Sequence, residues 1–354
     1  MALPPSNFRN VSWRPCGGTI RELWRRRPTR HLRSTRNCRT GPMQPLETIR
    51  DTAYAVIDVR SPAEYAQGHI PRAENIALFT NEERAEVGTL YVQQSREQAL
   101  LRGLELVGPK LAGFVTQAQA IAQGRPVVLY CWRGGMRSAS MAWLLRTAGL
   151  DVETIKGGYK AYRAHVHELL SKPWDLRVVA GYTGSGKTHY LHSLAAQGEQ
   201  VLDLEAICRH KGSSYGALGE LPQPSTEYAM NLMADVLAGF DLRRPVWVED
   251  ESRKVGHVVI PDVFFERMQA STIVLLDVPR EVRVQNLVQD YGHYDVQELV
   301  AATERIRRRL GGEQCTAAIA AIQDGDLTTA AAILLDYYDA AYDHYMKYRA
   351  RSRS

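Results

Sequence analysis

The chain has 354 residues, of which 45% are hydrophobic and 23% are charged, and its formal net charge is +5. These values are ordinary for a globular protein, and the length predicts two compact domains. No run of about 18 or more apolar residues occurs, so we expect no transmembrane helix and no membrane partner. The five cysteines form no C-x-x-C pair. Their number and spacing argue against a disulfide framework and a zinc site, and favour a cytoplasmic location.

Positive charge is concentrated in residues 1–42, which contain ten arginines and a single acidic residue, Glu22. The rest of the chain has 34 basic and 38 acidic residues, so it is mildly acidic. Because the segment shows no apolar periodicity, we expect a disordered and dispensable extension, with Met43 as the natural start. An Arg-rich transit peptide and an arm that contacts nucleic-acid phosphates are the alternatives.

Residues 43–165 alternate between apolar runs and helical patterns, which predicts an α/β domain built on a parallel sheet. Ser61 and Pro62 are typical of a helix start, as N-cap and first helical residue. The predicted strands and helices are strand 53–59, a helix from 62, helix 95–123, strand 127–130, helix 138–148, strand 152–155 and a helix from 159.

Residues 166–175 are predicted to connect this domain to a second α/β domain, 176–312. A helical extension, 313–354, is expected to pack against the second domain. The elements predicted there are strand 176–180, helix 187–196, strand 200–204, strand 245–249, strand 272–278 and helix 296–310.

A cysteine follows the predicted strand 127–130, and residues 131–138 read Cys-Trp-Arg-Gly-Gly-Met-Arg-Ser. Glycines here let successive backbone N–H groups turn inward as an anion nest, and the following helix adds its positive N-terminal end. The Cys131 thiol is therefore expected to have a lowered pKa and to exist largely as thiolate. A buried structural cysteine is the alternative. Cys131 and Arg137 also have the C-x-x-x-x-x-R spacing of cysteine-dependent phosphatases, which local spacing alone does not exclude.

Residues 181–188 read Gly-Tyr-Thr-Gly-Ser-Gly-Lys-Thr, a full P-loop between a predicted strand and a predicted helix. Backbone N–H groups of such a loop cradle a diphosphate, the lysine supplies a positive charge and the last hydroxyl can coordinate Mg²⁺. The motif does not specify which phosphate compound binds. The predicted phosphate-binding residues are Gly181, Gly184, Ser185, Gly186, Lys187 and Thr188.

Acidic residues follow the predicted strand 245–249. Glu249, Asp250 and the adjacent Glu251 are candidates for holding Mg²⁺ through water, with no direct protein ligand to the metal predicted. A solvated acidic turn is the alternative.

Several segments resemble known families. Residues 58–65, 68–73 and 157–159, together with the cysteine loop, resemble a rhodanese domain, in which the loop cysteine carries transferable sulfur or selenium. In this context Asp58 and Arg60 are expected to form a buried ion pair that orders loops, and His69 to be a structural turn residue. Both loops together resemble the tRNA 2-selenouridine synthase family over about residues 50 to 280. Further supporting segments are 82–91, 204–206, 210–216, 223–225, 249–253 and 255–256.

The resemblance implies a rhodanese-like parallel-sheet domain followed by a P-loop NTPase-like α/β domain with a helical C-terminal tail. The implied reaction acts on 2-thiouridine at the tRNA wobble position. A geranyl group from geranyl diphosphate alkylates the sulfur, and selenium from selenophosphate then replaces the S-geranyl group. On our hypothesis the P-loop, with Mg²⁺, holds the diphosphate, and Cys131 serves the selenium step as carrier or as part of the site. Arg133 and Arg137 would steer selenophosphate, and a selenophosphate-supplying enzyme would be a partner.

Two other functions compete with this interpretation. One is a cysteine-dependent phosphatase, arsenate reductase or sulfurtransferase fused to a P-loop kinase. The other is a non-catalytic sulfur-relay or RNA-binding module that uses a nucleoside triphosphate as a switch.

Overall fold

The computed structural model describes residues 49–351, so the predicted extension 1–42 lies outside the described residues. The described residues form one compact unit. Within the described part of the chain, no helix combines the length and the apolar character needed to cross a membrane.

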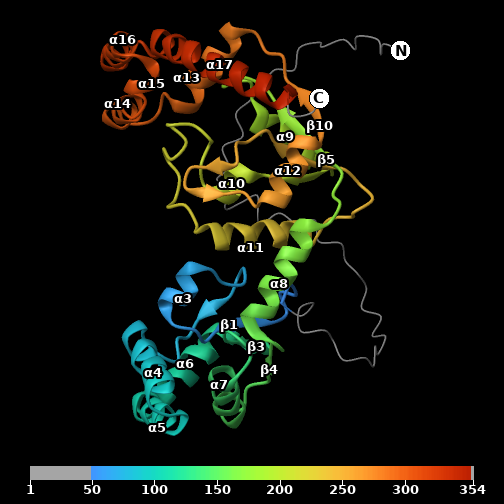
Figure 1. Cartoon of the computed structure of the whole chain (residues 1–354), viewed down its shortest axis with the longest axis vertical. Helices are drawn as coiled ribbons and strands as arrows, with labels where there is room; N and C mark the ends of the chain where they lie inside the picture. The colour runs from blue at the N-terminus through green and yellow to red at the C-terminus, as the bar shows by residue number, and fades with distance from the viewer. Residues whose placement is uncertain (1–48, 352–354) are drawn as a thin grey trace. The chain divides into compact units, whose positions relative to one another are not determined.

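The first domain is built on a four-stranded parallel sheet with strand order β2-β1-β3-β4 (Figure 1). Every residue of the two central strands is buried, as their uninterrupted apolar sequences predict. The strands are β1 (Ala55–Asp58), β2 (Glu74–Asn75), β3 (Val127–Tyr130) and β4 (Val152–Thr154). The helices are α3 (Pro62–Gln67), α4 (Asn81–Gln93), α5 (Arg96–Val107), η1 (Gly108–Lys110), α6 (Leu111–Ala122), α7 (Met136–Thr147) and α8 (Gly158–Ser171).

Two predicted elements of this domain differ in the structure. The helix predicted over 95–123 is divided by the 3-10 turn η1, because Pro109 has no backbone N–H to continue an α-helical ladder. Helix α8 runs to Ser171, so the first part of the predicted connection 166–175 is helical and packed rather than a linker. The predicted start of α3 is confirmed: Ser61 caps the helix and exchanges hydrogen bonds with Glu64 as a capping box.

The second domain has another four-stranded parallel sheet, with order β10-β5-β7-β6. The central position of β5 places the loop that follows it at the carboxyl edge of the sheet, beside the end of β7. The strands are β5 (Leu176–Ala180), β6 (Gln200–Leu202), β7 (Val246–Glu249), β10 (Thr272–Leu275) and the antiparallel pair β8 (Lys254–Val255) and β9 (Val258–Val259). The helices are α9 (Lys187–Ala196), α10 (Leu204–Cys208), α11 (Thr226–Leu237), α12 (Asp262–Ala270) and α13 (Arg280–Tyr291).

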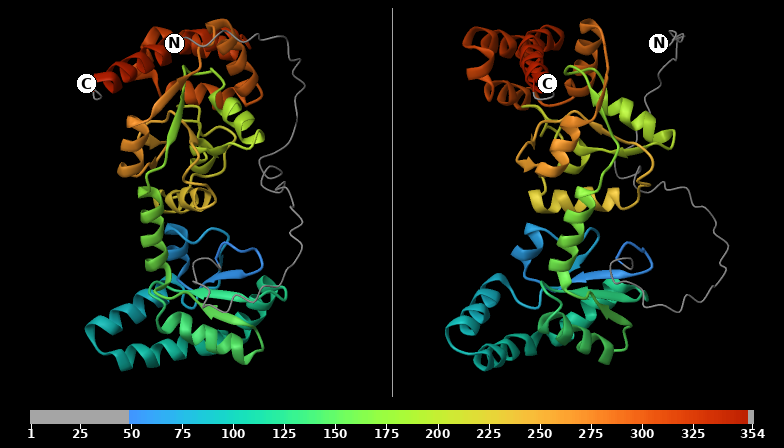
Figure 2. Two further views of the ribbon diagram at one scale, coloured as in Figure 1. Left: turned by 90° about the vertical axis from the view of Figure 1, so that its right-hand side faces the viewer. Right: turned by 45° about the vertical axis from the view of Figure 1, so that its right-hand side comes forward.

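Helices make up the C-terminal part, in orange to red in Figures 1 and 2. They are α14 (Val296–Glu304), α15 (Arg307–Leu310), α16 (Gly312–Gln323) and α17 (Leu327–Arg351). Buried side chains of α14, α16 and α17 form a hydrophobic cluster together with Tyr215 and Leu218 of the second domain. Helix α17 also ion-pairs with α13, through Asp339 and Arg283 at 2.8 Å. The predicted packing of this extension against the second domain is therefore confirmed.

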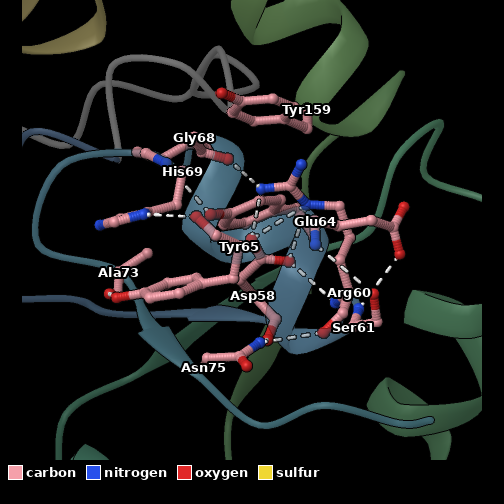
Figure 3. A network of polar contacts seen from close by, with 12 residues as sticks. Asp58, Arg60, Ser61, Glu64, Tyr65, Gly68, His69, Ala73, Asn75 and Tyr159 are labelled. Atoms are coloured by element: carbon pink, nitrogen blue, oxygen red, sulfur yellow. Dashed lines mark hydrogen bonds and ion pairs between the residues drawn. The ribbon is translucent and has the colours of Figure 1, made fainter. Parts of the chain in front are cut away.

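The predicted pair of Asp58 and Arg60 is buried at the carboxyl end of β1 (Figure 3). The Arg60 guanidinium donates to Asp58 Oδ2 and to the carbonyl oxygen of Gly68, both at 2.6 Å. Its carbon lies 3.8 Å from the ring centroid of Tyr159. Arg60 thus ties the strand end to the turn before β2, and His69 in that turn stacks between Tyr65 and Tyr228 as a structural residue.

We expect Arg60→Ala to lower the free energy of unfolding by about 3–5 kcal/mol, because it leaves the buried Asp58 carboxylate without its cation. Chemical denaturation of the full chain measures this loss. The matched control is Arg102→Ala, which breaks exposed ion pairs with Glu86 and Glu105 and should leave the free energy of unfolding nearly unchanged. Equal losses in the two variants would contradict the structural role of Arg60.

Candidate active site

The cysteine loop lies between β3 and α7, and its backbone is arranged as the predicted anion nest. The Ser138 hydroxyl lies 3.2 Å from the Cys131 sulfur, and the backbone N–H groups of Arg133, Gly135 and Ser138 act as donors that favour its thiolate. The sulfur therefore sits at the focus of donors, at the N-terminal end of a helix.

A second loop holds the cysteine loop in place. The N–H groups of Tyr159 and Lys160 donate to the carbonyl oxygens of Cys131 and Trp132, each at 2.9 Å. Gly158 has φ +59°, and a Cβ there would lie 2.3 Å from the Cys131 oxygen. Only glycine allows this contact, which explains the Gly-Gly pair at the start of α8, where Gly157 is the N-cap and Gly158 the first residue.

The environment lowers the pKa of Cys131. Burial of the 3% exposed side chain would raise the pKa, but the hydrogen bonds from Ser138, Gly135 and Arg133 outweigh burial and hold it below the ordinary 9.0. The expected direction of the shift is confirmed. Cys208, a buried free thiol in the second domain, shows the opposite behaviour, since burial and nearby carboxylates raise its pKa to about 12.

We expect Ser138→Ala to raise the pKa of Cys131, because the Ser138 hydroxyl is the largest of the groups that lower it. The thiolate absorbance of each protein, minus that of the same protein with Cys131→Ala, gives the titration midpoint. The wild-type midpoint should lie below 9.0 and the Ser138→Ala midpoint above that of the wild type. Ser140→Ala, two residues further along α7 and exposed, is the control and should leave the midpoint in place. An unmoved midpoint in Ser138→Ala would refute the assignment.

The two predicted anion-steering arginines differ in their surroundings. The Arg137 guanidinium binds Glu64 at 2.7 and 3.3 Å, so it is committed to a carboxylate of α3. The Arg133 side chain is exposed, and within residues 49–351 it has no ion pair. Arg133 is therefore the arginine of this loop that is available to a ligand, whereas Arg137 must first leave Glu64.

The P-loop connects β5 to α9, as its sequence context predicts. Gly184 and Gly186 have φ of +81° and +75°, and a Cβ on Gly184 would lie 2.7 Å from the carbonyl oxygen of Arg283. Lys187 Nζ donates to the Gly181 carbonyl oxygen at 3.1 Å, folding back along the loop. The Ser185 hydroxyl is buried without a hydrogen-bond partner, a polar atom that a bound phosphate could satisfy.

Several carboxylates lie near the end of the P-loop where α9 begins. The Thr188 hydroxyl donates to Glu205 Oε2 at 2.9 Å, and Glu249 accepts from the Leu204 N–H at 2.9 Å while its other oxygen has no partner. Burial and the charges of Asp203 and Glu205 raise the pKa of Glu249 well above its usual range. Burial and the charge of Glu205 raise the pKa of Glu251 to about 8, although Lys187 opposes the shift.

The several carboxylates beside the P-loop raise the question of whether this region can hold Mg²⁺. Within residues 49–351, no three acidic, histidine or cysteine side chains are arranged to hold a metal ion by themselves. Thr188, Glu205 and Glu251 fit an ion that is completed by phosphate oxygens and water, and such an ion would relieve the repulsion among the carboxylates.

Asp250 does not fit the role that we predicted for it. Its carboxylate is buried and binds Arg349 at 2.5 Å and the hydroxyls of Tyr342 and Tyr345 at 3.2 Å, all from α17. Tyr342 also accepts from the Gly181 N–H at 3.1 Å. Asp250 therefore binds α17 at the end of β7, and Tyr342 of α17 in turn contacts the P-loop. The negative charge next to Thr188 comes from Glu205 instead.

Glu205 is the contact that the sequence analysis missed. It lies in α10, just after β6, and the carboxyl ends of β6 and β5 share one edge of the parallel sheet. The sequence did contain a signal for it, because Glu205 is an acidic residue that directly follows the predicted strand 200–204 of the P-loop domain.

Two family comparisons cover most of the chain. Residues 44–165 match the rhodanese-like domain, and residues 174–353 match the tRNA 2-selenouridine synthase AAA domain. The second match includes the C-terminal helices, so the resemblance extends beyond the limit near residue 280 that we expected.

Individual relatives agree with these matches. A tRNA 2-selenouridine synthase of Nitrosomonas europaea is 41% identical over 257 residues, which are 69% of this chain and 64% of the relative. A tRNA 2-selenouridine synthase of Psychromonas ingrahamii is 31% identical over 327 residues, 83% of this chain and 88% of the relative. One of Marinobacter nauticus is 32% identical over 82% of this chain and 87% of its own length. The chain thus spans less than two thirds of the first of these relatives and most of the other two.

Proposed function

Because the chain belongs to the tRNA 2-selenouridine synthase family, we propose that it replaces the sulfur of 2-thiouridine at the tRNA wobble position by selenium. The proposal includes an S-geranylated intermediate, with geranyl diphosphate and selenophosphate as co-substrates. The observation that carries it is the presence of two anion-binding loops on one chain, one around a thiol of lowered pKa and one a P-loop with Lys187.

The first step is assigned to the P-loop. The sulfur of 2-thiouridine forms a bond to C1 of the geranyl group, the C1–O bond breaks, and its electron pair leaves with pyrophosphate while the N3 proton goes to solvent. Backbone N–H groups of residues 183–188 and the Lys187 ammonium would stabilise the charge that develops on pyrophosphate. Mg²⁺ bound near Thr188 and Glu205 would supply further charge stabilisation there.

The second step is assigned to the cysteine loop. S-alkylation makes C2 electrophilic and turns the sulfur into a leaving group. Selenium of selenophosphate then forms a bond to C2, geranylthiolate departs with the C2–S electron pair, and water cleaves the Se–P bond to release phosphate. Cys131 serves this step by completing the nest that holds selenophosphate, and the exposed Arg133 attracts the anion. An enzyme that supplies selenophosphate is the partner that this step requires.

The contacts of Arg137 argue against the phosphatase alternative. That chemistry needs the arginine of the C-x-x-x-x-x-R loop to face the phosphate, whereas Arg137 binds Glu64 at 2.7 Å. Release of phosphate from an aryl phosphate by the wild type, lost in Cys131→Ser, would revive this alternative.

Nucleoside mass spectrometry tests the proposal. Thiolated tRNA is incubated with the full chain, geranyl diphosphate, selenophosphate and Mg²⁺, and then digested to nucleosides. We expect S-geranyl-2-thiouridine to appear first and 2-selenouridine to follow. An unchanged 2-thiouridine peak, with folded protein and bound tRNA, would reject the proposal in favour of a relay or switch module.

A further inference from the structure

An apolar cavity lies in the C-terminal half of the chain, between the P-loop and the helical extension. It encloses about 580 Å³, part of it open to solvent. Helices α13, α14, α16 and α17, which are labelled in Figure 1, provide most of the residues that line it. Representative wall residues are Leu287, Val288, Leu299, Ile322, Ala331 and Leu334.

The cavity is continuous with the phosphate loop. Thr183 of the P-loop is part of its wall. The adjacent Gly184 packs against α13: its carbonyl oxygen accepts from Asn286 at 2.8 Å, and a Cβ on it would lie 3.0 Å from Leu287 Cγ. The next turn of α13 supplies Val288 and Tyr291 to the cavity. One ligand can therefore place a phosphate group in the loop and another part in the cavity.

The chemistry of the wall selects that second part. The aliphatic side chains that make up most of the wall offer no hydrogen bonds, the Tyr215 hydroxyl already bonds Thr303 at 2.5 Å, and the remaining polar groups are few, among them the Tyr338 hydroxyl. A nucleobase would lose most of its hydrogen bonds to water here, whereas a hydrocarbon chain would lose none. The wall thus favours a phosphate ester with an apolar tail over a nucleotide.

We propose that this cavity binds the hydrocarbon chain of a linear prenyl diphosphate of about ten carbons, while its diphosphate lies in the P-loop. This inference rests on the proposed function and adds to it the site that distinguishes the alkyl donor from a nucleoside triphosphate. Each methylene that the cavity removes from water is expected to tighten binding about fourfold, so a ten-carbon chain should bind well above its bare head group.

Isothermal titration calorimetry of the full chain in Mg²⁺ tests the inference with geranyl diphosphate and inorganic pyrophosphate as probes. The wild type should bind geranyl diphosphate at least about tenfold more tightly than pyrophosphate. In Ala331→Leu, whose added side chain fills the cavity, most of this advantage should disappear while pyrophosphate binding stays unchanged. The matched control is Ala340→Leu, at an exposed position of the same helix α17, which should keep the full advantage.

A second variant covers the case in which Ala331→Leu does not fold. Leu334→Ala enlarges the cavity and should shift the preference from geranyl diphosphate toward the fifteen-carbon farnesyl diphosphate. An unchanged chain-length preference in Leu334→Ala, or a full advantage in folded Ala331→Leu, would overturn the inference.

The outcomes also separate this inference from the proposed function. If the wild type forms S-geranyl-2-thiouridine but binds geranyl diphosphate no better than pyrophosphate, the role of the cavity is excluded and the proposed function stands. If the wild type binds neither diphosphate and forms no alkylated nucleoside, both the role of the cavity and the proposed function are excluded. Tight ATP binding that Ala331→Leu weakens would assign the cavity to a nucleotide, and so would overturn the inference.

Discussion

Substitution of Lys187 by alanine is expected to slow S-geranylation of thiolated tRNA by at least about a hundredfold, because it removes a positive charge from the departing pyrophosphate. The Lys187 ammonium lies within the P-loop, 3.1 Å from the Gly181 carbonyl oxygen, and no other lysine belongs to that loop. The rate of appearance of S-geranyl-2-thiouridine, measured by nucleoside mass spectrometry, gives the loss directly.

The design of this experiment isolates the first step. Pre-geranylated tRNA bypasses alkylation, so Lys187→Ala should still convert it to 2-selenouridine in the presence of selenophosphate. Lys254→Ala removes an exposed lysine of β8 in the same domain and should leave both steps at wild-type rates. Normal alkylation by Lys187→Ala, or failure of that variant on pre-geranylated tRNA alone, would show that the two loops have been assigned to the wrong steps.

Replacement of Cys131 by alanine should reduce the formation of 2-selenouridine by at least about a thousandfold. The sulfur is the atom on which the backbone donors of the cysteine loop converge, and the structure gives it a lowered pKa. S-geranyl-2-thiouridine should accumulate in this variant, because the P-loop remains intact.

The control for this variant is a cysteine in a different environment. Cys315 is buried in α16 and its thiol donates to the Thr303 carbonyl oxygen at 3.7 Å, away from both loops. Cys315→Ala should therefore retain selenation. If Cys131→Ala also retained it, selenium transfer would not depend on this thiol, and the cysteine loop would be left with an anion-binding role only.

Local features of this chain were readable before the fold was known. Ser61 caps α3, Lys187 begins α9, and the tight backbone of both loops follows from glycines at the required positions. Caps and phosphate loops are built from residues within a few positions of each other, and strand burial follows from uninterrupted apolar runs. The end of α8 and the break at Pro109 were missed because helix limits depend on packing as well as on propensity.

The sequence by itself determined the two loops, their strand–loop–helix context and the α/β class, because each of these is a property of neighbouring residues. Only the tertiary structure decided what the loop side chains contact. The pairs Thr188–Glu205, Arg137–Glu64 and Asp250–Arg349 join residues 17, 73 and 99 positions apart. No periodicity records such separations, since these contacts arise where parallel strands end at a common edge and where a C-terminal helix returns to the P-loop. The apolar cavity has the same origin, because its wall is assembled from helices that contribute only a few residues each.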